Sequence, residues 1–231
     1  GGKNHSEEVS AMAAPTGYDQ SFERSMEWIR RNMPMTHRAA AELPDLSGVR
    51  LACNMHLDPK MISFIEAVRN KGGELHLSPC NPATVDEKLI EAARSVGAES
   101  DARRGMSDKH WAGALESAIA WEPTHLCEMG AELSSALYGS NPLLSSRSLR
   151  AEGYGAGIRA GMEATGSGIT RLAEITASGK LEYPIFNWDD LPVKEGLHNR
   201  HMVGITAWHT FFERTGLTLH GKRVVVVGYG S

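Results

Sequence analysis

The sequence predicts an α/β fold with a doubly wound, mainly parallel sheet. From residue 18 onwards, short continuous apolar stretches alternate with stretches in which apolar residues recur every three or four positions. The first pattern is typical of strands buried on both faces, and the second is typical of amphipathic helices. Strands and helices that alternate in this way build right-handed crossovers onto a parallel sheet.

The helices are expected where apolar residues line one face. Phe22, Met26, Ile29 and Met33 have this spacing, and Pro34 is expected to end their helix. Capping residues and glycines mark the other helix boundaries. We expect helices at Tyr18 to Met33, from Asp58 to the Gly72–Gly73 pair, at Thr84 to Val96, at Ser107 to Ala120, from about Ser167 to Ile175 and at Gly204 to Arg214.

The strands are expected at the continuous apolar stretches between these helices. They fall at Val49 to His56, Glu74 to Ser78, Thr124 to Gly130, Gly157 to Ala164, Tyr183 to Trp188 and Val224 to Val227. Residues 131–148 carry no clear pattern. Residues 188–202 are polar and contain the proline, glycine and charges typical of a connector.

Composition and charge exclude several classes of protein. The net charge is -4 and the basic residues are scattered, which argues against nucleic acid or an anionic membrane as a partner. No stretch is long enough to span a membrane, and the first 17 residues, which we expect to be flexible, lack the apolar centre of a signal peptide. Three cysteines without CxxC spacing argue against a disulfide framework or a zinc site and favour the cytoplasm.

Polar residues follow three of the expected strands, at the edge where a doubly wound sheet binds its ligands. His56 ends the first strand and can act as a general acid or base, although a helix cap is an equal alternative. Cys80 and Asn81 follow the second strand, and Glu128 lies at the end of the third. For Cys80 the stronger interpretation is a small buried apolar residue. These side chains are predicted to meet in one crevice.

The connector carries a second group of candidates. Lys194 can take a proton if burial lowers its pKa, but a solvated lysine is the more common case. His198, Asn199 and His201 lie nearby. The two histidines have the spacing of helical metal ligands, but no third ligand is recognisable, so we expect no metal site.

The end of the sequence has the pattern of a nucleotide-binding turn. Val224 to Val227 run into Gly228, Tyr229 and Gly230, as in a buried strand that enters a glycine turn beneath a pyrophosphate. The third glycine, the following helix and the acidic residue about 20 positions further on are absent. We therefore expect that this segment does not hold a dinucleotide unaided.

A series of motifs resembles one family in order and spacing. They include LSGVRLACNMHLDPK, GGELHLSPCNPATVDE, EMGAEL, YPIFNWDDLPVK, HNR and LHGKRVVVVGYG. Together they resemble S-adenosyl-L-homocysteine hydrolase, or adenosylhomocysteinase, from about Met33 to the end. The resemblance implies a Rossmann-like substrate domain at residues 18–187, a hinge at 188–203, the start of an NAD-binding Rossmann domain at 204–231, and a homo-oligomer, normally a tetramer.

The resemblance also implies a reaction. NAD oxidises the ribose 3'-hydroxyl, homocysteine is eliminated, water adds, and the ketone is reduced again. His56 matches the histidine near the 5' position, Lys194 the lysine at the 3'-hydroxyl, and Asn199 the asparagine behind it. Asp58 and Lys60 lie in the segment that meets the adenine. The cofactor residues implied are Thr165, Ser167, Asn199, Gly228 and Gly230, and the substrate residues implied also include Cys80, Asn81 and Glu163.

Several acidic positions of the family are changed. Met129 stands where the family has a second aspartate, and Ala164 stands where it has a ribose-binding glutamate, with Glu163 next to it as a replacement. His198 replaces the aspartate that pairs with the lysine, and Glu128 is left as the ribose or water partner.

Three hypotheses follow from these residues. The first is a divergent NAD-dependent hydrolase of a nucleoside thioether, with His56 and Lys194 as acid-base residues and His198 as a substitute proton carrier. The second is a non-catalytic relative that binds a nucleoside or a protein partner. The third, a hydroxyacid dehydrogenase, has only the GYG turn in its favour.

Overall fold

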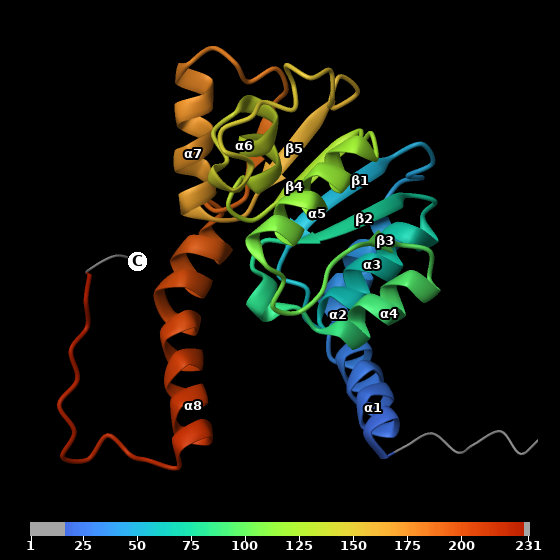
Figure 1. Ribbon diagram of the computed structural model, residues 1–231. Coiled ribbons are helices and arrows are strands. Elements are labelled where there is room, and N and C mark those ends of the chain that lie inside the picture. The colour runs from blue at the N-terminus through green and yellow to red at the C-terminus, as the bar shows by residue number, and fades with distance from the viewer. Residues whose placement is uncertain (1–16, 229–231) are drawn as a thin grey trace, which may run out of the picture.

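The centre of the molecule is a sheet of six parallel strands. The computed structural model describes residues 17–228, and the strand order is β3-β2-β1-β4-β5-β6 (Figure 1). The strands are β1 (Arg50–Met55), β2 (Glu74–Pro79), β3 (Glu99–Ser100), β4 (His125–Glu128), β5 (Ala160–Glu163) and β6 (Ile185–Asn187). The chain moves from β1 to one edge and then returns beside β1 to build the other half. The predicted doubly wound parallel sheet is confirmed, and the order reverses between β1 and β4.

Helices cover the sheet and extend from it. They are α1 (Gly17–Arg31), α2 (Pro34–Glu42), α3 (Met61–Asn70), α4 (Glu87–Ser95), α5 (Asp108–Ala120), α6 (Glu132–Tyr138), α7 (Gly166–Ala177) and α8 (Val203–Thr215). Two short 3-10 helices, η1 (Pro82–Thr84) and η2 (Pro142–Leu144), and one π-helix, η3 (Val193–Met202), complete the described chain. Helices α1 and α8 project from the same end of the sheet layer (Figure 1).

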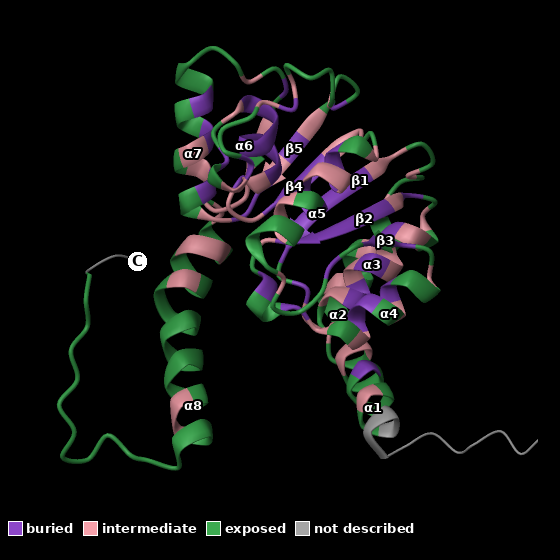
Figure 2. Ribbon diagram, viewed as in Figure 1, coloured by how far each residue is buried: buried purple, intermediate pink, exposed green. Residues whose placement is uncertain are grey.

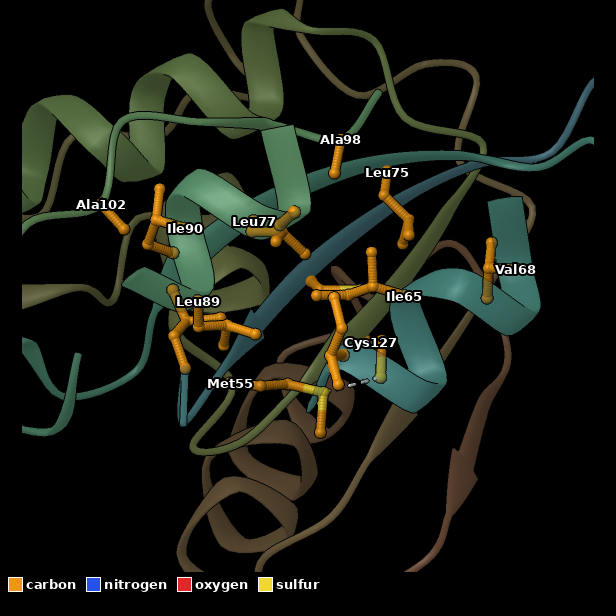
Figure 3. Packing of buried hydrophobic residues seen from close by; sticks show 14 of the residues in the cluster. Met55, Ile65, Val68, Leu75, Leu77, Leu89, Ile90, Ala98, Ala102 and Cys127 are labelled. Atoms are coloured by element: carbon orange, nitrogen blue, oxygen red, sulfur yellow. Dashed lines mark hydrogen bonds between the residues drawn. The ribbon is translucent and has the colours of Figure 1, made fainter. Parts of the chain in front are cut away.

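The core consists of two apolar clusters, one on each face of the sheet. Successive residues of a strand point to opposite faces, so Cys53 of β1 belongs to one cluster and Ala52 to the other. The first cluster packs α3 and α4 against β1 and β2, and Met55 and Cys127 lie side by side within it (Figure 3). The second packs α5 and α6 against β1 and β4. Burial of these residues holds the strand ends in place.

Several boundaries differ from the predictions. Pro34 follows the end of the first helix and is also the first residue of α2. At this position its missing N–H costs nothing. The helix predicted from Thr84 begins at Glu87, because the Asp86 carboxylate accepts hydrogen bonds from the N–H groups of Lys88 and Leu89. The two-residue strand β3 and helix α6 had not been predicted.

The predicted strand at Val224 to Val227 is wrong for this structure. These residues form no strand, and Val227 is 95% exposed. Figure 2 shows the segment as an exposed extension beyond α8. A strand is stable where a neighbour satisfies its backbone groups, and no strand among residues 17–228 pairs with this one.

Candidate functional site

The candidate residues lie at the carboxyl edge of four neighbouring strands. His56 follows β1, Cys80 follows β2, Glu128 ends β4 and Glu163 ends β5. The register pairs Glu128 with Asn54 on one side and with Glu163 on the other. Since all strands are parallel, these strand ends lie at one edge of the sheet. The side chains differ in whether a ligand can reach them.

His56 is accessible at this edge. Its ring is exposed, and Nδ1 lies 2.8 Å from Oγ1 of Thr84. The Thr84 hydroxyl donates to the backbone carbonyl of Asn81, so it is left to accept from the histidine. This arrangement orients the ring and leaves Nε2 directed away from the pair.

Asp58 and Lys60 form a small charged pair beside His56. Oδ1 of Asp58 accepts from the backbone N–H of Lys60 at 2.9 Å, and Oδ2 lies 3.5 Å from the ammonium. The Lys60 side chain is 73% exposed, so the ammonium keeps N–H groups for a ligand. The hydrogen-bonding pattern of α3 begins at Met61, and Asp58 caps the turn before it.

Cys80 and Asn81 have local roles. Burial raises the pKa of the Cys80 thiol to about 12, which argues against a thiolate nucleophile at neutral pH. The Asn81 side chain accepts from the backbone N–H of Ala83 and caps η1. Both residues shape the turn after β2.

Glu128 is buried and its carboxylate is occupied. One oxygen accepts from the backbone N–H groups of Leu133 and Ser134, and the other accepts from the Ser134 hydroxyl. That hydroxyl also contacts the phenol of Tyr183. Burial, helped by the charge of Glu163, raises the pKa of Glu128 to about 7. The geometry argues against direct contact with a ribose or a water, because no surface of this carboxylate is accessible.

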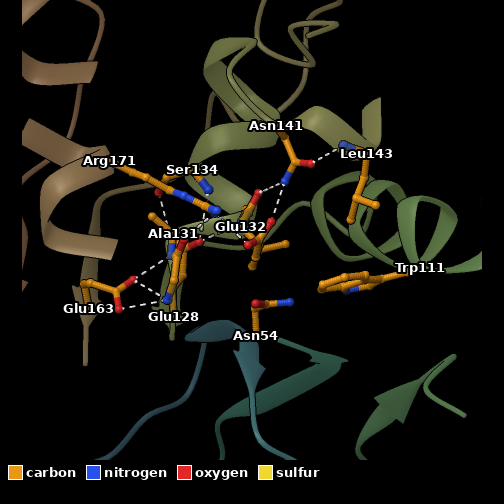
Figure 4. A network of polar contacts seen from close by, with 12 residues as sticks. Asn54, Trp111, Glu128, Ala131, Glu132, Ser134, Asn141, Leu143, Glu163 and Arg171 are labelled. Atoms are coloured by element: carbon orange, nitrogen blue, oxygen red, sulfur yellow. Dashed lines mark hydrogen bonds and ion pairs between the residues drawn. The ribbon is translucent and has the colours of Figure 1, made fainter. Parts of the chain in front are cut away.

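Glu163 is also fully buried by backbone groups. Its two oxygens accept from the N–H groups of Gly130, Ala131, Ala164 and Thr165. It therefore joins the loop after β4 to the start of α7 (Figure 4). The predicted takeover of ribose binding by Glu163 lacks an accessible oxygen, and neighbouring Ala164 is buried too.

The N-terminus of α7 presents the predicted cofactor hydroxyls. Thr165 precedes the helix, and its side chain makes no capping hydrogen bond, while Ser167 is exposed. A β-carbon at Gly166 would lie 3.1 Å from Oδ2 of Asp189, so this aspartate sits beside the same helix end. The edge of the sheet and the connector meet here.

The connector forms a polar cluster around Lys194. The lysine ammonium donates to Oδ1 of Asp189 at 2.7 Å and to Oδ1 of Asn199 at 3.2 Å. Asn199 donates to Glu195 at 2.8 Å. The side chains of Lys194 and Asp189 are only 17% and 13% exposed. With two of its three N–H groups held, the ammonium has one left for a ligand.

The π-helix explains this cluster. Residues five apart lie on one face of a π-helix, whereas they diverge in an α-helix. Lys194 and Asn199 are five apart within η3. Residues 193–202 of the predicted connector are thus helical, and this geometry brings the pair together.

The remaining predicted residues lie apart from this cluster or on its rim. His198 is exposed, with Nδ1 3.4 Å from Oδ1 of Asn199. Gly228 lies in the exposed extension, and Gly230 is outside the described residues. Within residues 17–228 no group of three or more metal-ligating side chains could hold a metal ion, and no helix has the length and apolarity to cross a membrane.

Sequence reasoning missed four polar residues of the edge. The acidic partner of Lys194 is Asp189 and not a residue at position 198. The WDD motif, which contains Asp189, could have indicated this partner. Glu132 binds both Arg171 and Asn141 (Figure 4). No signal pointed to this group, because residues 131–148 carried no pattern.

The structure does not bring His56 and Lys194 into contact. Strands β1 and β6, which precede them, are separated by β4 and β5. Three strand spacings correspond to about 14 Å. This is the spacing of the two strands, and Lys194 itself lies seven residues beyond the end of β6 at Asn187.

The fold and the edge define an α/β protein with accessible polar groups at the switch point of its sheet, the class that binds small molecules there. No family model matches the chain. Among curated proteins it is 30% identical over 211 residues to the adenosylhomocysteinase of Haloquadratum walsbyi. The aligned region covers 90% of this chain and 46% of that protein.

Two further relatives agree with this result. The adenosylhomocysteinase of Pyrobaculum aerophilum is 30% identical over 217 residues, 88% of this chain and 49% of that protein. The S-inosyl-L-homocysteine hydrolase of Methanococcus maripaludis is 28% identical over 220 residues, 94% of this chain and 49% of that protein. The chain is a divergent homologue of the adenosylhomocysteinases, and it spans about half the length of the curated relatives it matches.

Proposed function

We propose that this chain binds the nucleoside in a hydrolase that cleaves the thioether of S-adenosyl-L-homocysteine or of a related nucleoside. The observation that carries the proposal is the held ammonium of Lys194. It lies with Asp189 and Asn199 beside the N-terminus of α7, at the carboxyl edge of the sheet. Relatives named for this hydrolysis cover about 90% of the chain.

Lys194 is proposed to hold the ribose 3'-hydroxyl through its third N–H group and to exchange a proton with that oxygen. Asp189 and Asn199 fix the ammonium, which removes the rotamer freedom of a long side chain. His56, at the end of β1, is proposed to transfer a proton near the 5' position, where the thioether breaks. His198, on the rim of the cluster, stays a candidate proton carrier.

The family cofactor is NAD, which accepts a hydride from the ribose when it is bound. Thr165 and Ser167 would offer it hydroxyl groups at the N-terminus of α7. The described residues do not otherwise form a dinucleotide site, because the valine and glycine segment is exposed and unpaired. No proton step above depends on residues of that segment.

We also propose a setting for the protein. Cys53, Cys80 and Cys127 are free thiols, which fits a reducing cytoplasm. Assembly as a homo-oligomer, a small-molecule partner and no role for nucleic acid or membranes follow the resemblance and the charge of -4.

The direct test is release of homocysteine by the full-length protein. S-adenosyl-L-homocysteine and S-inosyl-L-homocysteine are each supplied with NAD, and the new thiol is measured with a thiol reagent. Release from at least one thioether is expected. Binding of both thioethers without release of thiol would contradict the hydrolase.

A non-catalytic role is the second candidate, and one observation favours it. Met129 and Ala164 stand at acidic positions of the family, and the neighbouring Glu128 and Glu163 are buried by backbone groups. A protein that only binds a nucleoside needs no acid at these positions. Calorimetric binding of the thioether without turnover would support this role.

A further inference from the structure

The loop between β3 and α5 forms one wall of a pocket. Strand β3 is the edge strand of the sheet, two strands away from β1, while Lys194 follows β6 at the other edge (Figure 1). The pocket has a volume of about 530 Å³ and is lined by this loop and by the first turns of α5. It shares no residue with the nucleoside site proposed above.

The pocket is rich in positive charge. Its lining contains Arg103, Arg104 and Lys109, and Asp101 is the only acidic residue that lines it within residues 17–228. The Asp101 carboxylate accepts a hydrogen bond from the Ser117 hydroxyl at 2.8 Å. The lining thus has an excess of positive charge, although the whole chain has a net charge of -4. A concave surface of one charge sign attracts ligands of the opposite sign.

Two of these cations are not neutralised by the fold. The side chains of Arg103 and Lys109 are exposed, and no hydrogen bond or ion pair from the described part of the chain holds them. By contrast, the guanidinium of Arg147 is held by Glu116 and Glu152. Arg103 and Lys109 therefore keep all of their N–H groups for a ligand.

His110 adds a neutral donor to the same pocket. Its Nδ1 lies 3.0 Å from the Ser107 hydroxyl oxygen, which also accepts from the backbone N–H of His110. The hydroxyl proton is then available to Nδ1, and these contacts assign the ring proton to Nε2. Since the ring is exposed, Nε2–H can donate to an anion.

This set of donors favours a phosphoryl group. The planar guanidinium matches two oxygens of a phosphate, and the ammonium adds a point charge. The volume lies within the range of about 300 to 1,000 Å³ that small organic ligands occupy, whereas a bare phosphate ion would leave most of the pocket to water. Met106 adds an apolar side chain to the lining. The pocket is therefore suited to a phosphate group that carries an organic part.

We propose that this pocket binds a phosphate monoester of a small molecule, with Arg103 and Lys109 on the phosphoryl oxygens and His110 as a further donor. The site is separate from the proposed nucleoside site, and it does not rest on the proposed function.

The test is calorimetric titration of the full-length protein in a buffer of low ionic strength, because salt screens exposed charges. The probe is glucose 6-phosphate, and glucose and inorganic phosphate are titrated separately as its two parts. We expect saturable binding of glucose 6-phosphate, a Kd for inorganic phosphate at least about threefold higher, and no binding of glucose.

Two variants assign the binding to the pocket. Arg103→Gln and Lys109→Gln should each raise the Kd of glucose 6-phosphate by at least about threefold, and together by at least about tenfold. Both side chains are exposed, so the melting temperature should stay unchanged. Arg159→Gln is the matched control, because Arg159 is an exposed arginine that precedes β5 at the opposite edge of the sheet. It should leave the Kd unchanged.

The contrary outcomes are distinct. If Arg103→Gln combined with Lys109→Gln binds glucose 6-phosphate as tightly as Arg159→Gln does, the pocket is not the site. If inorganic phosphate binds as tightly as glucose 6-phosphate, the pocket holds an anion alone and the monoester is wrong. If neither binds the unchanged protein, the proposal is wrong, while release of homocysteine from the thioethers still decides the proposed function.

Discussion

The fold disfavours the charged form of the buried Glu128 carboxyl group. Burial raises its pKa from 4.5 to about 7, so between these pH values the folded protein holds a proton that the unfolded chain has released. The contribution of this group to the free energy of unfolding is greatest below pH 4.5 and decreases as the pH rises to 7. The expected loss is about 3 kcal/mol, from about 1.4 kcal/mol per pKa unit.

This loss can be measured by comparison with Glu128→Gln, which cannot ionise. Urea unfolding at several pH values gives the free energy of unfolding of both proteins. Between pH 4.5 and 7.5 the free energy of unfolding of the wild type should fall by about 3 kcal/mol relative to that of the variant. A difference that stays constant with pH would show that Glu128 is ionised in the fold throughout.

Lys194 provides a prediction about activity at the same scale. Lys194→Met keeps the length of the side chain but removes the ammonium that Asp189 and Asn199 hold. Homocysteine release should fall by at least a factor of about 100, the usual contribution of a positioned acid-base group. Lys180→Met, at an exposed position after α7, is the control. Unchanged turnover in Lys194→Met, with an unchanged melting temperature, would remove the assignment.

The predictability of the site varies from residue to residue. His56 and Lys194 could be proposed from the sequence, because one ends a strand and the other matches a family motif. The burial of Glu128 and Glu163 could not, since it depends on backbone N–H groups of a turn with no sequence pattern. Asp189 was missed because its partner is fixed by the helical geometry of η3, which the composition of that segment does not suggest.

At the scale of elements, α7 is tied to the sheet through Gly168. A β-carbon there would lie 2.2 Å from Cδ of Glu163, which is fully buried and cannot move aside. Gly168→Ala should therefore destabilise the protein by about 2 to 4 kcal/mol. Gly113→Ala in α5 is the matched control, because no atom lies within 4 Å of the added carbon. The control should gain up to about 1 kcal/mol from helix propensity.

Thermal unfolding of the two variants checks this contrast. The prediction fails if Gly168→Ala is as stable as Gly113→Ala. Because both changes add one methyl group inside a helix, the comparison isolates the contact with Glu163 from the effect of the glycine on the unfolded chain.

The elements themselves were predictable where a local pattern sets them. Five of the strands were expected close to their observed positions, because continuous apolar stretches are buried on both faces. The valine run has the same pattern and forms no strand, since pairing depends on a neighbour and not on composition. Helix α2 was missed because a proline both ends one helix and starts the next.

At the scale of the whole molecule, α8 contributes little to the stability of the sheet. None of its residues is buried, and its aromatic residues Trp208, Phe211 and Phe212 contact one another. A chain that stops after Met202 should melt within about 3 °C of the longer chain, because no core burial is lost. A fall of 10 °C or more in a calorimetric scan would mean that α8 packs on the body in solution.

The π-helix η3 has a consequence for the direction in which α8 faces. A π-helix holds one more residue in its turn than an α-helix, and each residue of an α-helix advances it by about 100°. Deleting Gly196, which no atom crowds, would restore the tighter turn and keep Lys194 and Asn199 on one face at a spacing of four. Because the pair keeps its face, the helix beyond Asn199 keeps its rotational phase as well, and Thr206, Thr210 and Arg214 still face the cleft that they line with Asp58 and Lys60. The wide turn thus absorbs one extra residue, so a change of one residue in its length can be tolerated without altering the surface that α8 presents.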